Sequence, residues 1–137
     1  MTITATAPEA ATQDRADQHG RELLRELMPM HRELRHAIPD VYRGFGELSK
    51  AAFADGALPK KTKELMALAI GVVEGCDGCI ASHAQAAVRA GATRQEAAEA
   101  IGVTFLMHGG PATIHGARAY RDFCEFADAL EAGDSPA

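Results

Sequence analysis

The stretch KKTKELMALAIGVVEGCDGCIASHAQAAVRAG, residues 60–91, decides the fold of this chain. Its first half contains the run Leu65–Val73, which is apolar on nearly every helix face, the pattern of a helix buried by its neighbours or by another subunit. A glycine then releases the chain into a Cys-x-x-Cys turn, and a second helix should begin at Asp77 or Cys79 and end at Gly91. The stretch therefore predicts two successive helices joined by a turn that holds two cysteines.

Helical signals continue on the N-terminal side of this stretch. Apolar residues at helical spacing predict a helix over about 14–28, a break or a new first turn at Pro29, and a shorter helix to about Ala37. Pro39 should open another helix, which should stop near Gly56. We expect that helix to turn four apolar side chains toward the core: Val41, Phe45, Leu48 and Phe53.

Two further helices are predicted on the C-terminal side. Thr93 and Glu96 have the spacing of a capping box, which should start a helix that runs to about Met107. The Gly109–Pro111 segment should break the chain before a last helix that includes Tyr120. No segment shows the period-two alternation of a strand bounded by hairpin turns. The sequence therefore predicts an all-α fold of about six helices.

The size and composition are those of one ordinary globular domain. The chain has 137 residues, of which 47% are apolar and 24% charged. Tryptophan is absent and aromatic residues make up only 5%, so we expect a core of Leu, Ile, Val, Met and Ala. The first residues show no apolar periodicity. We therefore expect a mobile N-terminal tail at 1–12, a single domain at 13–131 and a C-terminal tail at 132–137.

Charge and hydropathy exclude several classes of partner. The formal net charge of −5 argues against nucleic acid, because phosphate-backbone binding needs a clustered basic surface. The N-terminus lacks the basic start and apolar run of a secretory signal, and no apolar run approaches the roughly 18 residues that span a bilayer. We therefore expect a cytoplasmic protein with no membrane partner. In that reducing compartment a close cysteine pair is more often redox-active or metal-binding than structural.

Four residues in the quoted stretch suit thiol redox chemistry. Cys76 and Cys79 have the spacing of a dithiol–disulfide pair, and the start of a helix favours thiolate over thiol. His83 lies one turn beyond Cys79, on roughly the same helix face as both cysteines, and should reach a sulfur directly or through one water. Glu64 and His83 can move the protons that the cycle consumes and releases.

Less specific interpretations of these residues stay open. Two cysteines and a histidine could bind zinc, with Glu64, His108 or His115 as the remaining candidate ligands. Glu64 alone could be an ordinary acidic residue in the first turn of a helix. His108 and His115 flank the predicted break and could line a pocket. Cys124, between two phenylalanines, is expected to pack as a small hydrophobic residue.

The chain resembles the alkylhydroperoxidase D-like, Cys-x-x-Cys-containing branch of the carboxymuconolactone decarboxylase superfamily. The resemblance runs from about Phe53 to Ala127 and is densest in FADGALPKKTKELMALAIGVVEGCDGCIASHAQAAVRAGAT and the later GGPA. Its specific signature is a glutamate, eleven intervening residues, Cys-x-x-Cys, three more residues and a histidine. In this chain these positions are Glu64, Cys76, Cys79 and His83.

The resemblance implies a helical bundle completed by oligomerisation, as a homotrimer or homohexamer. It also implies a thiol-dependent peroxidase that needs no cofactor or bound metal. Cys79 would be the peroxidatic thiol, Cys76 the resolving thiol, and Glu64 with His83 the proton relay. A dithiol such as lipoamide, or a redox protein, would reduce the resulting disulfide.

One departure and several rival functions accompany the resemblance. Gly78 stands where the characterised peroxidase has a further relay histidine. The decarboxylase branch lacks the Cys-x-x-Cys motif, which argues against lactone decarboxylation here. The remaining rivals are a general disulfide oxidoreductase, a non-enzymatic redox sensor whose pair oxidises once, and a structural zinc protein.

Overall fold

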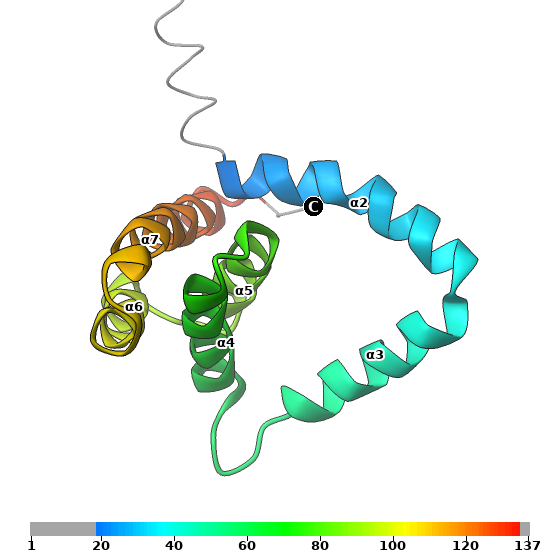
Figure 1. Cartoon of the computed structure of the whole chain (residues 1–137), viewed down its shortest axis with the longest axis horizontal. Coiled ribbons are helices and arrows are strands. Elements are labelled where there is room, and N and C mark those ends of the chain that lie inside the picture. Colours follow the sequence, from blue (N-terminus) through cyan, green and yellow to red (C-terminus); the bar gives the residue numbers. More distant parts are fainter. Residues whose placement is uncertain (1–18, 135–137) are drawn as a thin grey trace, which may run out of the picture.

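The computed structural model describes residues 19–134, and within that range every regular element is a helix (Figure 1). This confirms the predicted all-α fold of about six helices. The predicted N-terminal tail at 1–12 lies outside the described residues, as do the last three residues of the predicted C-terminal tail. The elements are α2 (His19–Ala37), α3 (Pro39–Ala52), α4 (Lys60–Glu74), α5 (Asp77–Arg89), α6 (Arg94–His108) and α7 (Gly110–Glu131).

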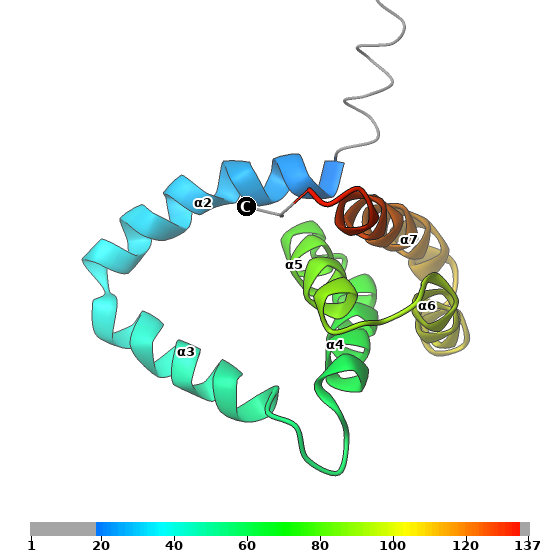
Figure 2. The ribbon, with the colours of Figure 1, turned by 180° about the vertical axis from the view of Figure 1, so that it is seen from behind.

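Helices α4 to α7 form the bundle, and α2 with α3 forms an arm that leaves it (Figures 1 and 2). Helix α4 packs against α5 and α6, and α7 packs against α5 and α6. The start of α2 crosses α5 and the end of α7, where the backbone N–H groups of Gly20 and Arg21 donate to the Glu125 carboxylate at 2.9 and 3.1 Å. This carboxylate satisfies otherwise unpaired donors at a helix start.

The core is built largely from small side chains. Among residues 19–134, eight of the fifteen buried apolar residues are alanines, which lets the helix axes approach closely. The largest fully buried apolar side chains are Phe123, Leu68, Ile80 and Val72. The expectation of methionine in the core is wrong, since every methionine in the described range is exposed, and Phe123 with Phe126 supplies the bulk instead.

The predicted break at Pro29 is wrong. Helix α2 continues through Pro29 to Ala37 without interruption. Proline removes one N–H donor and crowds the carbonyl of Arg25, four residues earlier. Both Pro29 and Arg25 are exposed, so water can bond that carbonyl and the helix tolerates the proline there.

The predicted direction of the α3 apolar side chains is also wrong within this chain. Val41, Phe45 and Leu48 are 64%, 68% and 64% exposed. Helix α3 packs beside the end of α2 and lies apart from the bundle (Figure 1), so its apolar face meets no core. The helix also ends at Ala52, short of the predicted stop near Gly56.

The C-terminal predictions are confirmed more closely. Thr93 and Glu96 form the capping box of α6: the Glu96 N–H donates to Thr93 Oγ1 at 3.1 Å, and the Thr93 N–H donates to Glu96 Oε2 at 2.8 Å. Gly109, with φ of 76°, separates α6 from α7. No helix in the described range is long and apolar enough to cross a membrane.

Candidate functional site

The turn between α4 and α5 places the two cysteines. Helix α4 ends at Gly75, whose φ of 64° is left-handed and whose N–H donates to the carbonyls of Gly71 and Val72. A residue with a side chain is disfavoured in this conformation. The chain reverses there and enters α5 with Cys76 as the residue that caps the helix start.

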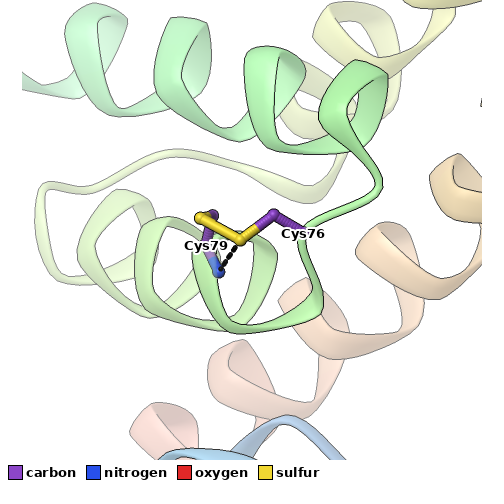
Figure 3. The surroundings of a disulfide bond; sticks show 2 residues. All are labelled: Cys76 and Cys79. Atoms are coloured by element: carbon purple, nitrogen blue, oxygen red, sulfur yellow. Dashed lines mark hydrogen bonds between the residues drawn. A yellow bond between two sulfur atoms is a disulfide. The ribbon is translucent and has the colours of Figure 1, made fainter. Parts of the chain in front are cut away.

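Cys76 and Cys79 are joined by a disulfide, with their Cα atoms 5.2 Å apart (Figure 3). The Cys79 N–H donates to Cys76 Sγ at 3.2 Å, which is the hydrogen bond a capping side chain accepts at a helix start. Cys76 is half-buried and Cys79 is exposed. One sulfur is therefore held by the helix terminus, and the residue that carries the other is open to solution.

Glu64 and His83 form the second pair of the site. Glu64 is only 4% exposed, and its Oε2 lies 2.9 Å from His83 Nδ1. Glu64 lies in the second turn of α4, so the alternative of an ordinary acidic residue in the first turn does not describe it. An ionised carboxylate only accepts hydrogen bonds, so the proton of this bond is on Nδ1 and Nε2 is the free ring nitrogen.

The structure brings the four predicted site residues together as two pairs on adjacent helices. Glu64 lies on α4, while Cys79 and His83 lie one turn apart on α5, which packs against α4. Within residues 19–134, no hydrogen bond joins His83 to either sulfur. The predicted direct contact is therefore not made in the disulfide form.

His115 lies behind the cysteine turn. Its Nε2 would be 3.0 Å from a Cβ atom placed on Gly75, so the imidazole packs directly against the turn. Its Nδ1 is buried and has no hydrogen-bond partner among the described residues. Of the two histidines that flank the predicted break, His115 thus lies near the site, whereas His108 is exposed at the end of α6.

The position of Gly78 is covered by the arm. A Cβ atom at Gly78 would lie 3.1 Å from Leu27 Cδ1 of α2. At Gly78 this chain therefore has an apolar contact between α2 and the cysteine turn.

Sequence reasoning missed one neighbour of the site. Phe53, assigned to the core, instead stacks on the His83 imidazole with ring centroids 5.5 Å apart and an interplanar angle of 29°. No spacing rule links an aromatic residue in the α3–α4 connection with a histidine thirty positions later, so only the fold reveals this contact.

The third cysteine lies away from the pair. Cys124 is a free, half-buried thiol on α7. The Cys124 side chain, one turn further along α7, raises the pKa of the Tyr120 phenol. In the described part of the chain, no group of three or more His, Cys, Asp or Glu side chains is arranged to hold a metal ion.

Residues 39–122 match the model of the carboxymuconolactone decarboxylase family. The chain belongs to this family. Helices α3 to α6 and the first half of α7 fall within the matched range. Family membership together with a cysteine pair at disulfide distance fits a redox role.

One sequence relative and two solved structures match this chain over most of their own length. An uncharacterized protein of Cupriavidus necator is 38% identical over 109 residues, which cover 80% of this chain and 93% of that protein. The crystal structure of a carboxymuconolactone decarboxylase family protein from Legionella pneumophila has a TM-score of 0.78 at 38% identity and covers 80% of this chain and 98% of its own. A family member from Thermotoga maritima, for which a part in an antioxidative response has been suggested, has a TM-score of 0.70 at 29% identity, over 82% of this chain and 98% of its own.

Proposed function

We propose that this protein is a thiol-dependent peroxidase that reduces alkyl or other hydroperoxides through a Cys76–Cys79 dithiol–disulfide cycle. The observation that carries the proposal is the disulfide at the start of α5, with Cys79 exposed and the Glu64–His83 pair on the neighbouring turns. Family membership and the suggested antioxidative part of the Thermotoga relative support it.

The oxidative half of the cycle uses the exposed cysteine. The Cys79 thiolate attacks the terminal oxygen of the hydroperoxide, the O–O bond breaks, and Cys79 becomes a sulfenic acid. The departing alkoxide takes a proton and leaves as an alcohol. His83 Nε2 takes the proton of the Cys79 thiol when the thiolate forms and then gives it to the alkoxide, and the Glu64 carboxylate stabilises the imidazolium between the two transfers.

The resolving step closes the disulfide. The Cys76 sulfur attacks the sulfur of the Cys79 sulfenic acid, the S–S bond forms, and hydroxide leaves as water with the proton that Cys76 loses. With Cα atoms 5.2 Å apart, the two residues are placed for this bond in the fold as it stands.

The reductive half begins at the same exposed cysteine. A thiolate of the reductant attacks Cys79 Sγ, and Cys76 leaves as a thiolate that the Cys79 N–H and the helix start stabilise. The second thiol of the reductant then attacks the mixed disulfide and restores the Cys76–Cys79 dithiol. A cytoplasmic dithiol or a redox protein is the reductant we propose.

A thiol count with turnover tests the function. Fully reduced protein is treated with one equivalent of an organic hydroperoxide, and peptide mapping should show rapid loss of two thiols and a Cys76–Cys79 link. With excess dithiol, a peroxidase continues to consume peroxide, whereas a redox sensor stops after one equivalent. Three unchanged thiols would refute the peroxidase and favour a disulfide oxidoreductase that never meets peroxide.

We also propose that a second copy of this chain covers the arm, in a homotrimer or homohexamer. The α3 face of Val41, Phe45 and Leu48 is exposed, and one chain also exposes Met66 and Ile70 on α4. Exposed apolar faces of this extent on separate helices are typical of interfaces rather than of monomer surfaces. Every copy carries both the α3 face and the exposed α4 residues, so the apolar residues of one copy can pack against those of another.

A further inference from the structure

Phe53 connects the end of the arm to the candidate proton relay. It is the first residue after α3, and its ring stacks on His83 at 5.5 Å between centroids with 29° between the planes. We infer that Phe53 is a positioning residue that holds the His83 imidazole in the orientation needed for proton transfer. The inference rests on the proposed peroxidase function and deepens it.

The backbone around Phe53 is fixed to the helix that carries Glu64. The Lys60 N–H donates to Asp55 Oδ1 at 2.7 Å, and Lys63 Nζ donates to the Ala54 carbonyl at 2.6 Å. Both donors lie in the first turn of α4: Lys60 is one turn before Glu64, and Lys63 directly precedes it. Phe53 follows the exposed arm in sequence, but these two hydrogen bonds tie the segment after it to the start of α4. Phe53 and Glu64 are therefore held in place relative to each other where they contact His83.

Glu64 alone does not define the orientation of the His83 ring. Its hydrogen bond restrains Nδ1 at the edge of the ring but makes no contact with the ring face, so it opposes tilting of the ring about the Cβ–Cγ bond, which moves Nε2, only in part. A second ring stacked on the face of the imidazole opposes this rotation, and aromatic pairs at such distances are favourable beyond their burial. The His83 side chain is 29% exposed, so solvent on its open side does not oppose this rotation. The Glu64 hydrogen bond at the ring edge and the Phe53 ring on its face together restrain the direction in which Nε2 points.

Replacing the aromatic ring tests this role. Phe53→Leu and Phe53→Met both remove the stacking ring. The methionine side chain is close in volume to phenylalanine, so Phe53→Met serves as the test if Phe53→Leu fails to fold. We expect kcat for hydroperoxide to fall roughly tenfold with KM changed less than about twofold, because misplacement of a transfer group affects the chemical step. Phe53→Tyr should restore kcat. Phe105→Leu, the same change at an exposed position on α6, is the matched control and should leave kcat unchanged.

A second readout needs no peroxide. In the oxidised protein, the Nδ1–H proton of His83 should give a downfield NMR resonance, assigned by its loss in His83→Gln. The leucine and methionine variants should lose it through faster exchange with water, and Phe53→Tyr and Phe105→Leu should keep it. If wild-type protein consumes no peroxide, the proposed function fails, and this resonance still decides whether Phe53 holds His83. An unchanged resonance, or an unchanged kcat in an active enzyme, would overturn the positioning role.

Discussion

The Glu64 carboxylate and the His83 imidazole, nineteen residues apart in the chain, lie 2.9 Å apart between α4 and α5. Glu64 is buried, whereas the His83 side chain is 29% exposed. A buried carboxylate needs a partner, and this one has a histidine that also reaches the surface. The pair thus joins the interior of the bundle to the side on which Cys79 opens.

Changing the two members of this pair should reduce turnover by different amounts. His83→Gln removes the proton-transfer group, so we expect kcat/KM for hydroperoxide to fall roughly 10²-fold or more. Glu64→Gln should cost less, because the amide oxygen can still accept the Nδ1–H bond although it no longer stabilises an imidazolium. Steady-state kinetics measure both. His108→Gln, at an exposed position, is the control. Equal activity in wild type and His83→Gln would remove His83 from the mechanism.

The cysteines should separate into distinct roles when each is replaced by serine. Cys79→Ser should not react with hydroperoxide, because the attacking sulfur is gone. Cys76→Ser should consume one equivalent and stop at the sulfenic acid, which a dimedone-type probe labels and mass spectrometry detects. Cys124→Ser is the matched control, since it removes the free thiol on α7 and should keep full turnover. Labelling of Cys76 in the Cys79→Ser variant would reverse the two assignments.

The sequence predicted the bundle better than the arm, for a physical reason. Helices α4 to α7 follow from local signals, such as the Thr93–Glu96 capping box, that agree with their burial. In the arm, the apolar face of α3 has the same periodicity as a core helix, and periodicity alone does not tell whether the same chain or another subunit covers that face. The prediction of a break at Pro29 is wrong because the free-energy cost of a proline inside a helix depends on whether water can bond the freed carbonyl, and the sequence does not show that exposure.

The site shows the same division. The spacing of Glu64, Cys76, Cys79 and His83 predicts that these residues lie on two neighbouring helices and the turn between them, and the structure places them there. The contact of Phe53 with His83 was missed because it comes from packing between segments far apart in the chain. The sequence marks His115 as a possible pocket residue, but its packing against Gly75 has the same long-range origin. Long-range contacts of this kind carry no periodic signal, so only the tertiary structure identifies them.

A charge placed on the exposed face of α3 should prevent assembly. Phe45→Glu puts a carboxylate in the middle of the Val41, Phe45 and Leu48 face, where burial against another subunit would leave it unpaired. We expect light scattering to show an oligomer for wild type and a smaller species for the variant. Lys50→Glu adds negative charge to the same helix at an exposed polar position and should keep the wild-type mass. A monomeric wild type would contradict the proposed assembly.

Two hydrogen bonds make Glu96 a source of acid sensitivity. Lys61 Nζ donates to Glu96 Oε1 at 2.8 Å, and the Thr93 N–H donates to Oε2 at 2.8 Å. Both favour the charged carboxylate, and the Lys61 bond is the larger cause of the lowered pKa of Glu96. A carboxyl whose pKa is lowered on folding contributes stability above its unfolded-state pKa and loses it as the pH falls through the folded-state value.

The contribution of Glu96 should therefore be complete at neutral pH and disappear progressively below about pH 4.5, the ordinary value of a glutamate. Glu96→Gln keeps an oxygen for the Thr93 N–H but cannot ionise, so its unfolding midpoint in urea should fall less steeply with acid than that of wild type. Glu74→Gln, at the exposed end of α4, removes a carboxylate that forms no ion pair within residues 19–134 and serves as control. Parallel acid profiles for wild type and Glu96→Gln would show that the contacts from Lys61 and Thr93 do not link protonation to folding.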